Sequence, residues 1–405
     1  MTLALNFVSS LLSWYDANRR ELLWRDHPDP YSVLVSEFML QQTTVTAVIP
    51  YFEKWMKVYP TVKDLSDAEP SQVLRSWEGL GYYSRARNLH AAAGEIVTKY
   101  GGKVPDGLAN LKKLPGIGDY TAAAVASIAF GVRAPALDAN NLRVWSRLLA
   151  SSDRKKIGRV FARVLPPDRP GDFNQALMDL GSSVCTPRNP ICTACPLAPW
   201  CRAFRTGSVS EYPEKKARPD TTRIEAAIGI IINDDRVLVQ RRPDRGLMAR
   251  LWEFPGGKIG KATGHGDAET RRRGGKTDSS KAVKADSPQS MRRDAEEKPG
   301  HGHTDTRTHG VKVSYESAEE AVVREVREET GLSIQVCEKL GVFNHSYTRF
   351  KVKLHVFICK RRGGTVHNPT AKWVTPKELE GLAMPSVNRK IVKKLEEYLD
   401  DDSFD

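Results

Sequence analysis

The chain has 405 residues, which is enough for two domains, because single domains usually run to about 100 to 200 residues. Its formal charge of +13, from 62 lysines and arginines against 49 aspartates and glutamates, favours a polyanionic partner, with nucleic acid first. Six cysteines are too few for an extracellular disulfide framework in a chain of this size, and four of them gather in residues 185–201, which indicates a reducing compartment.

The elements expected in the first half are helices. Residues 1–20 have an apolar spacing that suits an amphipathic helix, and they lack the basic start and small-residue cleavage site of a signal peptide. No other stretch approaches a membrane span, so no membrane partner is expected. Later apolar-periodic segments, separated by short proline and glycine breaks, predict helices over residues 33–55, 86–100, 120–131, 141–150 and 173–184.

A turn with two glycines precedes the third of these segments, in the stretch "LPGIGDYTAAAVAS". Gly116 and Gly118 allow backbone N–H groups to approach an anion at the positive end of the helix, where a DNA phosphate fits. An ordinary turn between two helices explains the same residues. Farther along, Asp138 in "APALDANNLRV" stands just ahead of a helix, where an N-cap is the commonest use of an aspartate.

Four cysteines follow the last of these helices with the spacing C-x6-C-x2-C-x5-C, at Cys185, Cys192, Cys195 and Cys201. Four thiolates so close in sequence fit either a tetrahedral zinc site or a [4Fe-4S] cluster. Zinc sites more often pair one C-x2-C with a second, whereas these unequal gaps suit one irregular loop around a bulkier group. Reduced structural cysteines are the third alternative.

The hydrophobic pattern changes after residue 222. Residues 206–222 are rich in charge and proline and predict a linker. Strands with an Asn-Asp-Asp turn are expected within residues 225–242 and another strand over 351–361, and a helix closes the chain from residue 388. Residues 260–310 are nearly devoid of large apolar side chains and predict a disordered insertion. The second domain, residues 223–405, is therefore expected to mix helices and strands.

The stretch "REVREETGL" places three carboxylates on one face of a helix, because Glu325, Glu328 and Glu329 are spaced i, i+3 and i+4. Such carboxylates repel one another unless a cation lies among them, so a weakly bound divalent metal such as Mg²⁺ is predicted. The alternative is a solvated surface helix in which Arg324 forms i, i+4 pairs with its glutamates.

The first 205 residues resemble the MutY branch of the helix-hairpin-helix DNA glycosylases, a group that includes endonuclease III. The likeness is carried by "LLWRDHPDPYSVLVSEFMLQQT", "EGLGYYSRARNLH", the glycine hairpin, Asp138 and the cysteine spacing. It implies a multidomain protein with an all-α helix-hairpin-helix glycosylase domain over residues 1–205 and a [4Fe-4S] cluster in the loop 185–201. It also implies an α+β Nudix-like domain after it.

The function implied by this resemblance is base excision repair. The enzyme would hydrolyse the N-glycosidic bond of adenine mispaired with 8-oxoguanine or guanine in double-stranded DNA, as a monomer. Its location would be the cytoplasm, with the nucleoid, in a bacterium, and the nucleus in a eukaryote. The alternatives are an endonuclease III-like glycosylase of other base specificity, and a Nudix nucleotide pyrophosphohydrolase fused to a DNA-binding domain.

The resemblance also assigns roles to residues. Glu37 would protonate the adenine and later activate water, which requires a dry pocket that raises its pKa. Asp138 would stay ionised and stabilise the sugar cation, with Asn140 and Tyr120 as orienting groups. The family's bifunctional lyases have a lysine at the position of Tyr120, and a phenol forms no Schiff base, so a monofunctional glycosylase is expected.

The contacts to DNA follow by the same resemblance, together with two departures from the family pattern. Asp119 stands where the hairpin often has a basic or neutral residue and is expected to cap the helix instead, and Ala139 replaces the glycine of Asp-Gly-Asn. Gln42 and Tyr82 are expected to wedge the duplex, and Thr43 and Leu80 to flank the opposing base. The adenine pocket is expected to be lined by Trp24, Arg25, Leu40 and Gln175, and phosphate to bind at Gly116 and Gly118.

In the second half, "GLMARLWEFPGGK" and "REVREETGL" resemble a Nudix domain split by the insertion. The Nudix pattern runs from Gly310 through Glu316 and Arg324 to Leu332, although Gly257 is the equivalent first glycine by context. In the family this domain reads the damaged guanine opposite the adenine. Thr348 would donate a hydrogen bond to the damaged guanine, whereas Arg349 replaces a histidine of the family. Hydrolysis of nucleoside triphosphates by this domain is expected to be absent or slow.

Overall fold

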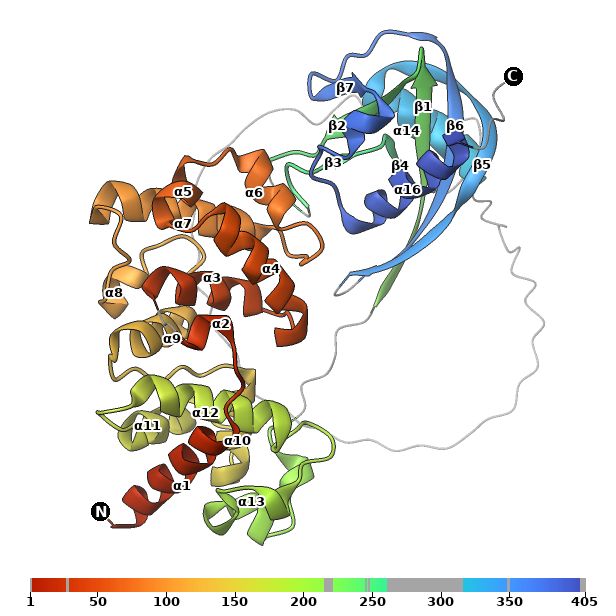
Figure 1. Cartoon of the computed structure of the whole chain (residues 1–405). Helices are drawn as coiled ribbons and strands as arrows, with labels where there is room; N and C mark the ends of the chain where they lie inside the picture. The colour runs from red at the N-terminus through yellow and green to blue at the C-terminus, as the bar shows by residue number, and fades with distance from the viewer. Residues whose placement is uncertain are drawn as a thin grey trace, which may run out of the picture.

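The computed structural model describes residues 2–26, 29–214, 221–244, 246, 248–260, 316–347 and 350–400. Within these ranges the chain forms a helical domain and a domain built on a β-sheet, which lie next to each other in Figure 1. The disorder predicted for the insertion 260–310 concerns residues outside the described ranges, apart from Gly260, and so do the predicted roles of Gly310, Thr348 and Arg349. None of the described helices is both long and apolar enough to cross a membrane.

The helical domain confirms the expected element type. Its elements are α1 (Thr2–Asn18), α2 (Leu23–Asp26), α3 (Pro30–Leu40), α4 (Val45–Val58), α5 (Val62–Asp67), α6 (Pro70–Ser76), α7 (Ser84–Tyr100), α8 (Leu108–Leu111), α9 (Asp119–Phe130), α10 (Ala139–Leu149), α11 (Arg154–Val164), α12 (Pro170–Ser183), η1 (Cys192–Ala194), η2 (Ala198–Trp200), α13 (Arg202–Arg205) and η3 (Val209–Glu211).

Two details of the sequence prediction are wrong. The segment 33–55 is two helices, α3 and α4, because Gln42 adopts a left-handed φ of 59° and Thr44 starts a new helix. Asp119 does not cap α9: the N-cap is Gly118, and Asp119 is the first helical residue, 2.6 Å from Lys112 Nζ. Its charge is thereby partly neutralised beside the hairpin.

Two hydrophobic cores hold the helices of this domain. One packs α3 to α9 around large buried side chains such as Phe38, Trp55 and Trp77. The other packs α1 against α10, α11 and α12, with Phe161 and Phe173 at its centre. A cavity between the helices is lined by residues from both cores, among them Glu37 and Asp138, so the packing of the two cores sets its width.

The segment predicted as a linker is attached to the helical domain at its start. Arg147 of α10 donates from Nε to the carbonyls of Val209 and Tyr212, at 3.2 and 3.1 Å. Residues 215–220 lie outside the described ranges. The first strand begins at Thr222.

The second domain is built on a mixed seven-stranded sheet with the order β3-β2-β1-β6-β5, in which β4 pairs with β1 and β7 with β2. β1 and β6 are parallel, and the β5–β6 pair is antiparallel. Helix α14 covers one face of the sheet, and α16 covers the other. The elements are β1 (Thr222–Asn233), β2 (Arg236–Arg241), β3 (Trp252–Glu253), β4 (Gly256–Lys258), α14 (Ala318–Thr330), β5 (Leu332–Tyr347), β6 (Phe350–Gly364), β7 (Ala371–Val374), α15 (Pro376–Leu379) and α16 (Ser386–Asp400).

The two domains contact each other beside the start of α7. Leu251 and Ala383 of the second domain are buried in the α3–α9 core. Tyr83 donates its hydroxyl to the carbonyl of Met384 at 3.1 Å, and Arg389 forms an ion pair with Glu78 at 2.5 Å. This interface lies directly before and after the turn at residues 79–82, one of the predicted DNA-contacting segments.

Candidate active site

Helix α3 buries a carboxyl group without giving it a full set of partners. The helix starts at an Asp29 N-cap, whose side chain accepts from the Ser32 N–H, and carries Glu37 in its last turn among apolar side chains. Glu37 is 4% exposed, and its buried Oε2 has no hydrogen-bond partner among the described residues. The pKa of Glu37 is raised to about 7, chiefly by burial. The hydrogen bond with the Tyr120 hydroxyl opposes this rise and is the smaller effect. This carboxyl can therefore hold a proton near neutral pH.

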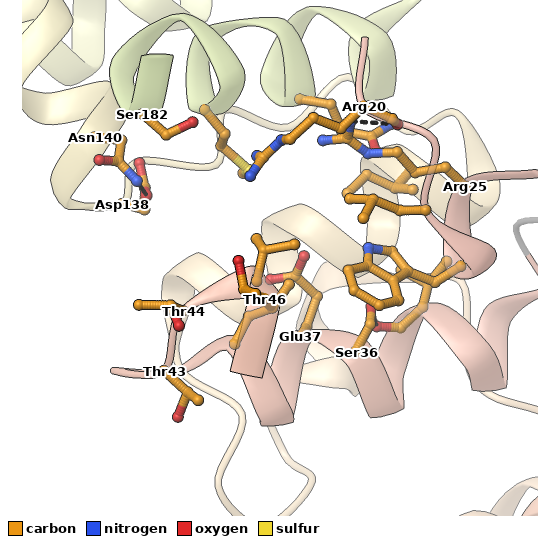
Figure 2. Close-up of a pocket in the computed structure, with 18 of the residues that line it drawn as sticks. Arg20, Arg25, Ser36, Glu37, Thr43, Thr44, Thr46, Asp138, Asn140 and Ser182 are labelled. Atoms are coloured by element: carbon orange, nitrogen blue, oxygen red, sulfur yellow. Dashed lines mark hydrogen bonds between the residues drawn. The ribbon is translucent and has the colours of Figure 1, made fainter. Parts of the chain in front are cut away.

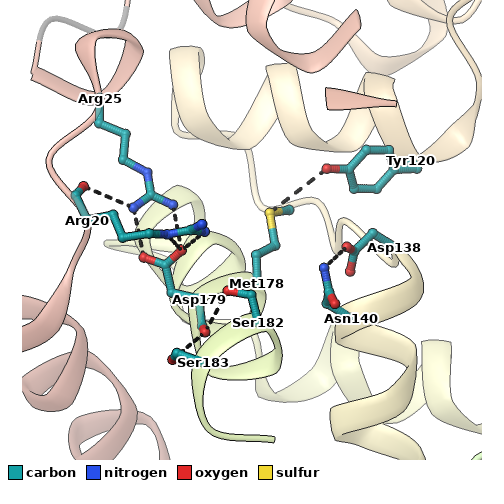
Figure 3. Close-up of polar contacts among 9 residues, drawn as sticks. All are labelled: Arg20, Arg25, Tyr120, Asp138, Asn140, Met178, Asp179, Ser182 and Ser183. Carbon is teal, nitrogen blue, oxygen red and sulfur yellow. Dashed lines mark hydrogen bonds and ion pairs between the residues drawn. The ribbon is translucent and has the colours of Figure 1, made fainter. Parts of the chain in front are cut away.

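Asp138 faces the same cavity from the start of α10. It is the N-cap of that helix, and its Oδ1 accepts from the Asn141 N–H at 2.6 Å while its Oδ2 accepts from Asn140 Nδ2 at 3.0 Å (Figure 3). Arg143 in turn donates to Asn140 Oδ1 at 2.8 Å. Burial raises the pKa of Asp138, and the N–H groups of Asn141 and Asn140 oppose that rise. The N-cap interpretation of Asp138 is confirmed, and its catalytic role stays a prediction.

Tyr120, on α9, lines the same cavity as the two carboxyl groups. Its hydroxyl is 3.9 Å from Met178 Sδ and also faces Glu37 closely enough to change that residue's pKa. Burial, followed by the charges of Glu37 and Asp138, raises the pKa of Tyr120 well above its ordinary value. The phenol therefore stays protonated at neutral pH and can donate a hydrogen bond.

One ion-paired cluster beside the cavity was missed by the sequence analysis. Asp179 of α12 is 2% exposed and accepts from Arg25 Nη1 at 2.8 Å and Nη2 at 3.1 Å. Arg20 donates to the same carboxylate from Nε at 2.9 Å. Little in the sequence signals this cluster, because Asp179 is one of two aspartates in a helix that also contains Asn174 and Gln175. Asp179 neutralises Arg25, which otherwise faces Glu37 as a free cation.

The carboxyl groups open into a cavity of about 440 Å³. In Figure 2, Glu37, Thr43, Thr44 and Thr46 lie on one side and Asp138, Asn140 and Ser182 on the other. The predicted residues that line it are Trp24, Arg25, Glu37, Leu40, Thr43, Tyr120, Asp138, Asn140 and Gln175. Further lining residues that the sequence analysis did not single out include Arg20, Ser36, Met178 and Ser182.

The other predicted DNA contacts lie outside this cavity. Gln42 is exposed, and Tyr82 is 44% exposed although large and aromatic. Both adopt left-handed backbone conformations, with φ of 59° and 48°, whereas Leu80 is buried. Gly116 has a φ of 77°, and a Cβ there would lie 2.6 Å from Asn88 Cβ, so the turn before α9 requires glycine. Gly118 is exposed at the N-terminus of α9, where its backbone is accessible to an anion.

Comparison with known proteins agrees with this geometry. Residues 35–167 match the HhH-GPD superfamily of base excision DNA repair proteins, and residues 227–288 and 308–394 match the NUDIX domain. An adenine DNA glycosylase of Buchnera aphidicola is 35% identical over 257 residues, which cover 62% of this chain and 73% of that protein. The chain belongs to the adenine DNA glycosylase family.

Other members of the adenine DNA glycosylase family are longer. The enzyme of Arabidopsis thaliana is 41% identical over 293 residues, which cover 60% of this chain and 46% of that protein. The human enzyme is 37% identical over 310 residues, which cover 62% of this chain and 57% of that protein. The chain thus spans about half the length of these relatives. Among solved structures, a thermostable thymine-DNA glycosylase is 31% identical with a TM-score of 0.48, covering 50% of this chain and 97% of that one.

The cysteine loop of this family member gathers its four thiols around one small cavity. Cys185, Cys192, Cys195 and Cys201 all line it. Arg147 lies 3.2 Å from Cys185 Sγ through its Nη1, and burial raises the pKa of Cys195 to about 11. Thiolates are the form that binds metal, so these half-buried thiols would ionise more readily with a cationic group among them. Four thiols are the donor type of an iron–sulfur cluster, but in the described ranges the four sulfurs are not arranged as a group that holds a metal ion.

The carboxylates of α14 have partners from the protein. Arg324 Nη1 is 2.8 Å from Glu325 Oε1, and its Nε donates to Glu316 Oε2 at 3.0 Å. Glu329 accepts from the Gly256 N–H at 3.1 Å and from Gln240. The cation among these carboxylates is thus the Arg324 guanidinium. Within the described ranges, no set of three or more histidine, cysteine, aspartate or glutamate side chains is arranged to hold a metal ion.

The glycine loop predicted from "FPGGK" packs directly on α14. A Cβ at Gly257 would lie 2.2 Å from Glu325 Oε2, so only glycine fits there without displacing that carboxylate. The described residues therefore bring Gly257, Arg324 and Glu325 together. The predicted weak divalent metal stays a prediction.

Proposed function

We propose that this protein is a monofunctional base excision repair glycosylase, which hydrolyses the N-glycosidic bond of adenine mispaired with 8-oxoguanine or guanine in double-stranded DNA. The observation that carries the proposal is the pair of carboxyl groups across one cavity, in which burial raises the pKa of Glu37 to about 7. The names of the family's members, adenine DNA glycosylases from plants to bacteria, support adenine as the base.

The chemistry follows from the two carboxyl groups. Glu37 donates its proton to the extruded adenine at N7, and the electrons of the C1′–N9 bond move onto the base as the bond breaks. Asp138 stabilises the positive charge that develops on the sugar. Water then adds to C1′ and gives a proton to the Glu37 carboxylate, which returns to its starting form. The products are free adenine and an abasic site.

The pocket supplies binding rather than proton transfer. Trp24 and Leu40 offer apolar surface for a purine, and Gln175 offers an amide that can hydrogen-bond the base edge. Tyr120 has no amine and forms no Schiff base with the sugar. The expected product therefore keeps its DNA strand intact until alkali is added, and borohydride traps no covalent adduct.

The test is single-turnover excision on a duplex with adenine opposite 8-oxoguanine, and on a panel with other bases in place of that adenine. Glu37→Gln should lose at least about 100-fold in rate, because the amide has no proton to give. Glu53→Gln, at an exposed position of α4, is the matched control and should equal the wild type. Excision of a different base, or an active Glu37→Gln protein, would contradict the proposal.

We further propose that Cys185, Cys192, Cys195 and Cys201 hold a [4Fe-4S] cluster. Support comes from the four thiols around one cavity and from the Arg147 donor to Cys185. Iron and acid-labile sulfide should each approach four per chain in anaerobically purified protein. Stoichiometric zinc without iron would contradict it.

The substrate also sets where and how the protein works. We also propose that the protein acts as a monomer. Action on chromosomal DNA places it with the nucleoid in a bacterium or in the nucleus of a eukaryote. Fractionation with tagged protein and sedimentation with a mispaired duplex test both statements.

A further inference from the structure

Helix α7 begins with a buried arginine, Arg85. Its hydrogen-bond partners among the described residues are carbonyl and hydroxyl oxygens, and none is a carboxylate. Arg85 is 5% exposed, and its guanidinium donates to five backbone carbonyls and one hydroxyl. A buried charge without a carboxylate partner is costly, and Arg85 Nε also has no hydrogen-bond partner among the described residues, so the burial of this arginine calls for an explanation. Burial lowers the pKa of Arg85 to about 10, and the side chain stays charged at neutral pH.

One nitrogen of Arg85 holds the end of the helix that carries the proposed acid. Nη1 donates to the carbonyls of Phe38, Met39 and Gln41, at 3.0, 2.6 and 2.6 Å. The last carbonyls of a helix have no partner within the helix, and a cation there also complements the helix dipole. Glu37 lies in the same final turn of α3. The position of the acid is therefore tied to Arg85.

The other terminal nitrogen holds two turns that are far apart in sequence. Nη2 donates to Thr43 Oγ1 at 3.0 Å, to the Leu80 carbonyl at 3.0 Å and to the Gly81 carbonyl at 3.1 Å. The guanidinium also lies 5.6 Å from the centre of the Tyr82 ring. One planar group thus joins the turn at residues 41–43 to the turn at residues 79–82.

Both turns contain a residue whose backbone needs external support. Gln42 and Tyr82 adopt left-handed φ angles of 59° and 48°, which side chains other than glycine rarely adopt. Such conformations persist where the surroundings fix them, and they gather at functional sites. These two exposed side chains are the proposed wedge residues, and Arg85 contacts the backbone immediately next to each of them.

We propose that Arg85 is a positioning residue that locks the turns of Gln42 and Tyr82 to the end of the Glu37 helix. Opening of the duplex and protonation of the extruded base then occur in one fixed geometry. A lysine cannot replace it, because a single ammonium group cannot reach both sets of oxygens that the planar fork joins. The inference rests on the proposed glycosylase function.

The experiment compares the wild type with Arg85→Lys and Arg85→Met in single-turnover excision and in duplex binding. An error of about 1 Å in the placement of reacting groups can lower a rate about 100-fold. Both variants should therefore lose about 100-fold in rate on the adenine and 8-oxoguanine duplex. Affinity for the duplex should change by less than about tenfold, because phosphate contacts dominate it.

Base extrusion is measured separately, with 2-aminopurine in place of the adenine and Glu37→Gln as the background, so that the base is retained. Its fluorescence should rise on binding, because the base leaves the stack, and the rise should be lost when an Arg85 substitution is added. A purely structural role would lower the amount of folded protein without changing the signal per bound duplex. Thermal unfolding of each variant measures the folded fraction.

The control is Arg133→Met, since Arg133 also donates to backbone carbonyls, those of Leu165 and Arg163, but is exposed and lies away from both turns. It should match the wild type within about twofold in every assay. If the Arg85 variants keep the fluorescence rise, the inference is overturned, whether or not their rates fall; wild-type rates in Arg85→Lys overturn it equally. Absence of excision by the wild type would instead contradict the proposed function.

Discussion

Glutamates on two helices of this protein meet opposite conditions. Glu37 of α3 is buried, its Oε2 has no hydrogen-bond partner among the described residues, and its pKa is raised to about 7. On α14, by contrast, Glu325 is paired with Arg324, and Glu329 accepts from a backbone N–H and from Gln240. Burial raises the pKa of Glu329 as well, so Glu37 and Glu329 differ in the partners of their carboxyl groups rather than in the direction of this effect. A buried carboxyl oxygen without a hydrogen-bond partner remains available to exchange a proton.

The difference lies in what surrounds each helix. Asp179 takes up the charge of Arg25, so that no free cation pairs with Glu37. On α14 the nearest cation, Arg324, belongs to the same helix and contacts its glutamates directly. We therefore assign the chemistry to the helical domain and a supporting role to α14. Four predictions test that assignment.

The largest effect is expected at the residue across the cavity from Glu37. Asp138→Asn should lower the single-turnover excision rate about 1,000-fold, because it removes the charge that stabilises the sugar cation. Asparagine is an equally good N-cap, so α10 should keep its stability. Duplex binding should stay within roughly tenfold of the wild type, since no phosphate contact is lost. A turnover close to the wild type would remove Asp138 from the mechanism.

The second prediction concerns pH. Glu37 must be protonated to act as an acid, and its pKa is raised to about 7, so kcat/KM should fall roughly tenfold per unit above pH 7. In the pH window from the ordinary carboxyl value up to about 7, the folded protein binds a proton that the unfolded chain has released. The wild type should therefore lose stability relative to Glu37→Gln as pH rises through this window.

Two measurements check the sign. The pH dependence of kcat/KM should show the descending limb near 7 in the wild type, and urea unfolding at several pH values should show the relative stabilisation of Glu37→Gln at the basic end. A rate that keeps rising to pH 9 would mean that the carboxylate, not the acid, is the active form. Equal slopes of stability against pH in the two proteins would mean that the Glu37 pKa is ordinary.

A smaller effect is expected when the cation of the site is released. In Asp179→Asn, Arg25 loses its counter-ion and attracts the Glu37 carboxylate, so the pKa of Glu37 should fall by about 1 unit. The descending limb of the pH profile should move to lower pH, and the rate at pH 7.5 should fall up to about tenfold. Asp172→Asn, on the same helix but paired with Arg169, is the control and should leave the limb in place. An unmoved limb in Asp179→Asn would show that Arg25 does not affect Glu37.

Local patterns in the sequence were sufficient for the helical domain and for the residues that resemble the family motifs. Glu37, Asp138, Tyr120 and Gln175, predicted from separate segments, line one cavity in the structure. The resemblance supplied that grouping, because nothing in their spacing shows which helices meet. The break at Gln42 inside the segment 33–55 was missed, since a left-handed residue leaves no mark on hydrophobic periodicity.

The residues that the sequence analysis missed act over long sequence separations. Arg85 lies 47 residues from Phe38, and Asp179 lies 154 residues from Arg25, which was itself predicted. Neither arginine stands in a helical i, i+4 relation to its partner, so charge pattern alone gives no signal. The same holds for α14, where the repulsion of Glu325 and Glu329 suggested a metal. Gln240 and Gly256, the protein partners of Glu329, are donated by strands that the sequence does not place beside the helix.

The smallest effect on excision is expected on α14. Glu328 is 61% exposed at its side chain and its Arg324 contact is long, at 3.4 Å, so Glu328→Gln should change the excision rate by less than about twofold. Glu319→Gln, at another exposed position of α14, is the control.

With Mg²⁺ and 8-oxo-dGTP or a panel of nucleoside triphosphates, the wild type should release phosphate or pyrophosphate slowly or not at all. The reason is that Arg324 already occupies the space among the carboxylates, and Gly257 approaches Glu325 as closely as a backbone can. Any Mg²⁺ that binds must compete with that guanidinium and should bind weakly. Robust nucleotide turnover that disappears in Glu328→Gln but not in Glu319→Gln would make α14 a second catalytic helix. Helices α3 and α14 would then both be reactive and would differ in the substrate on which they act.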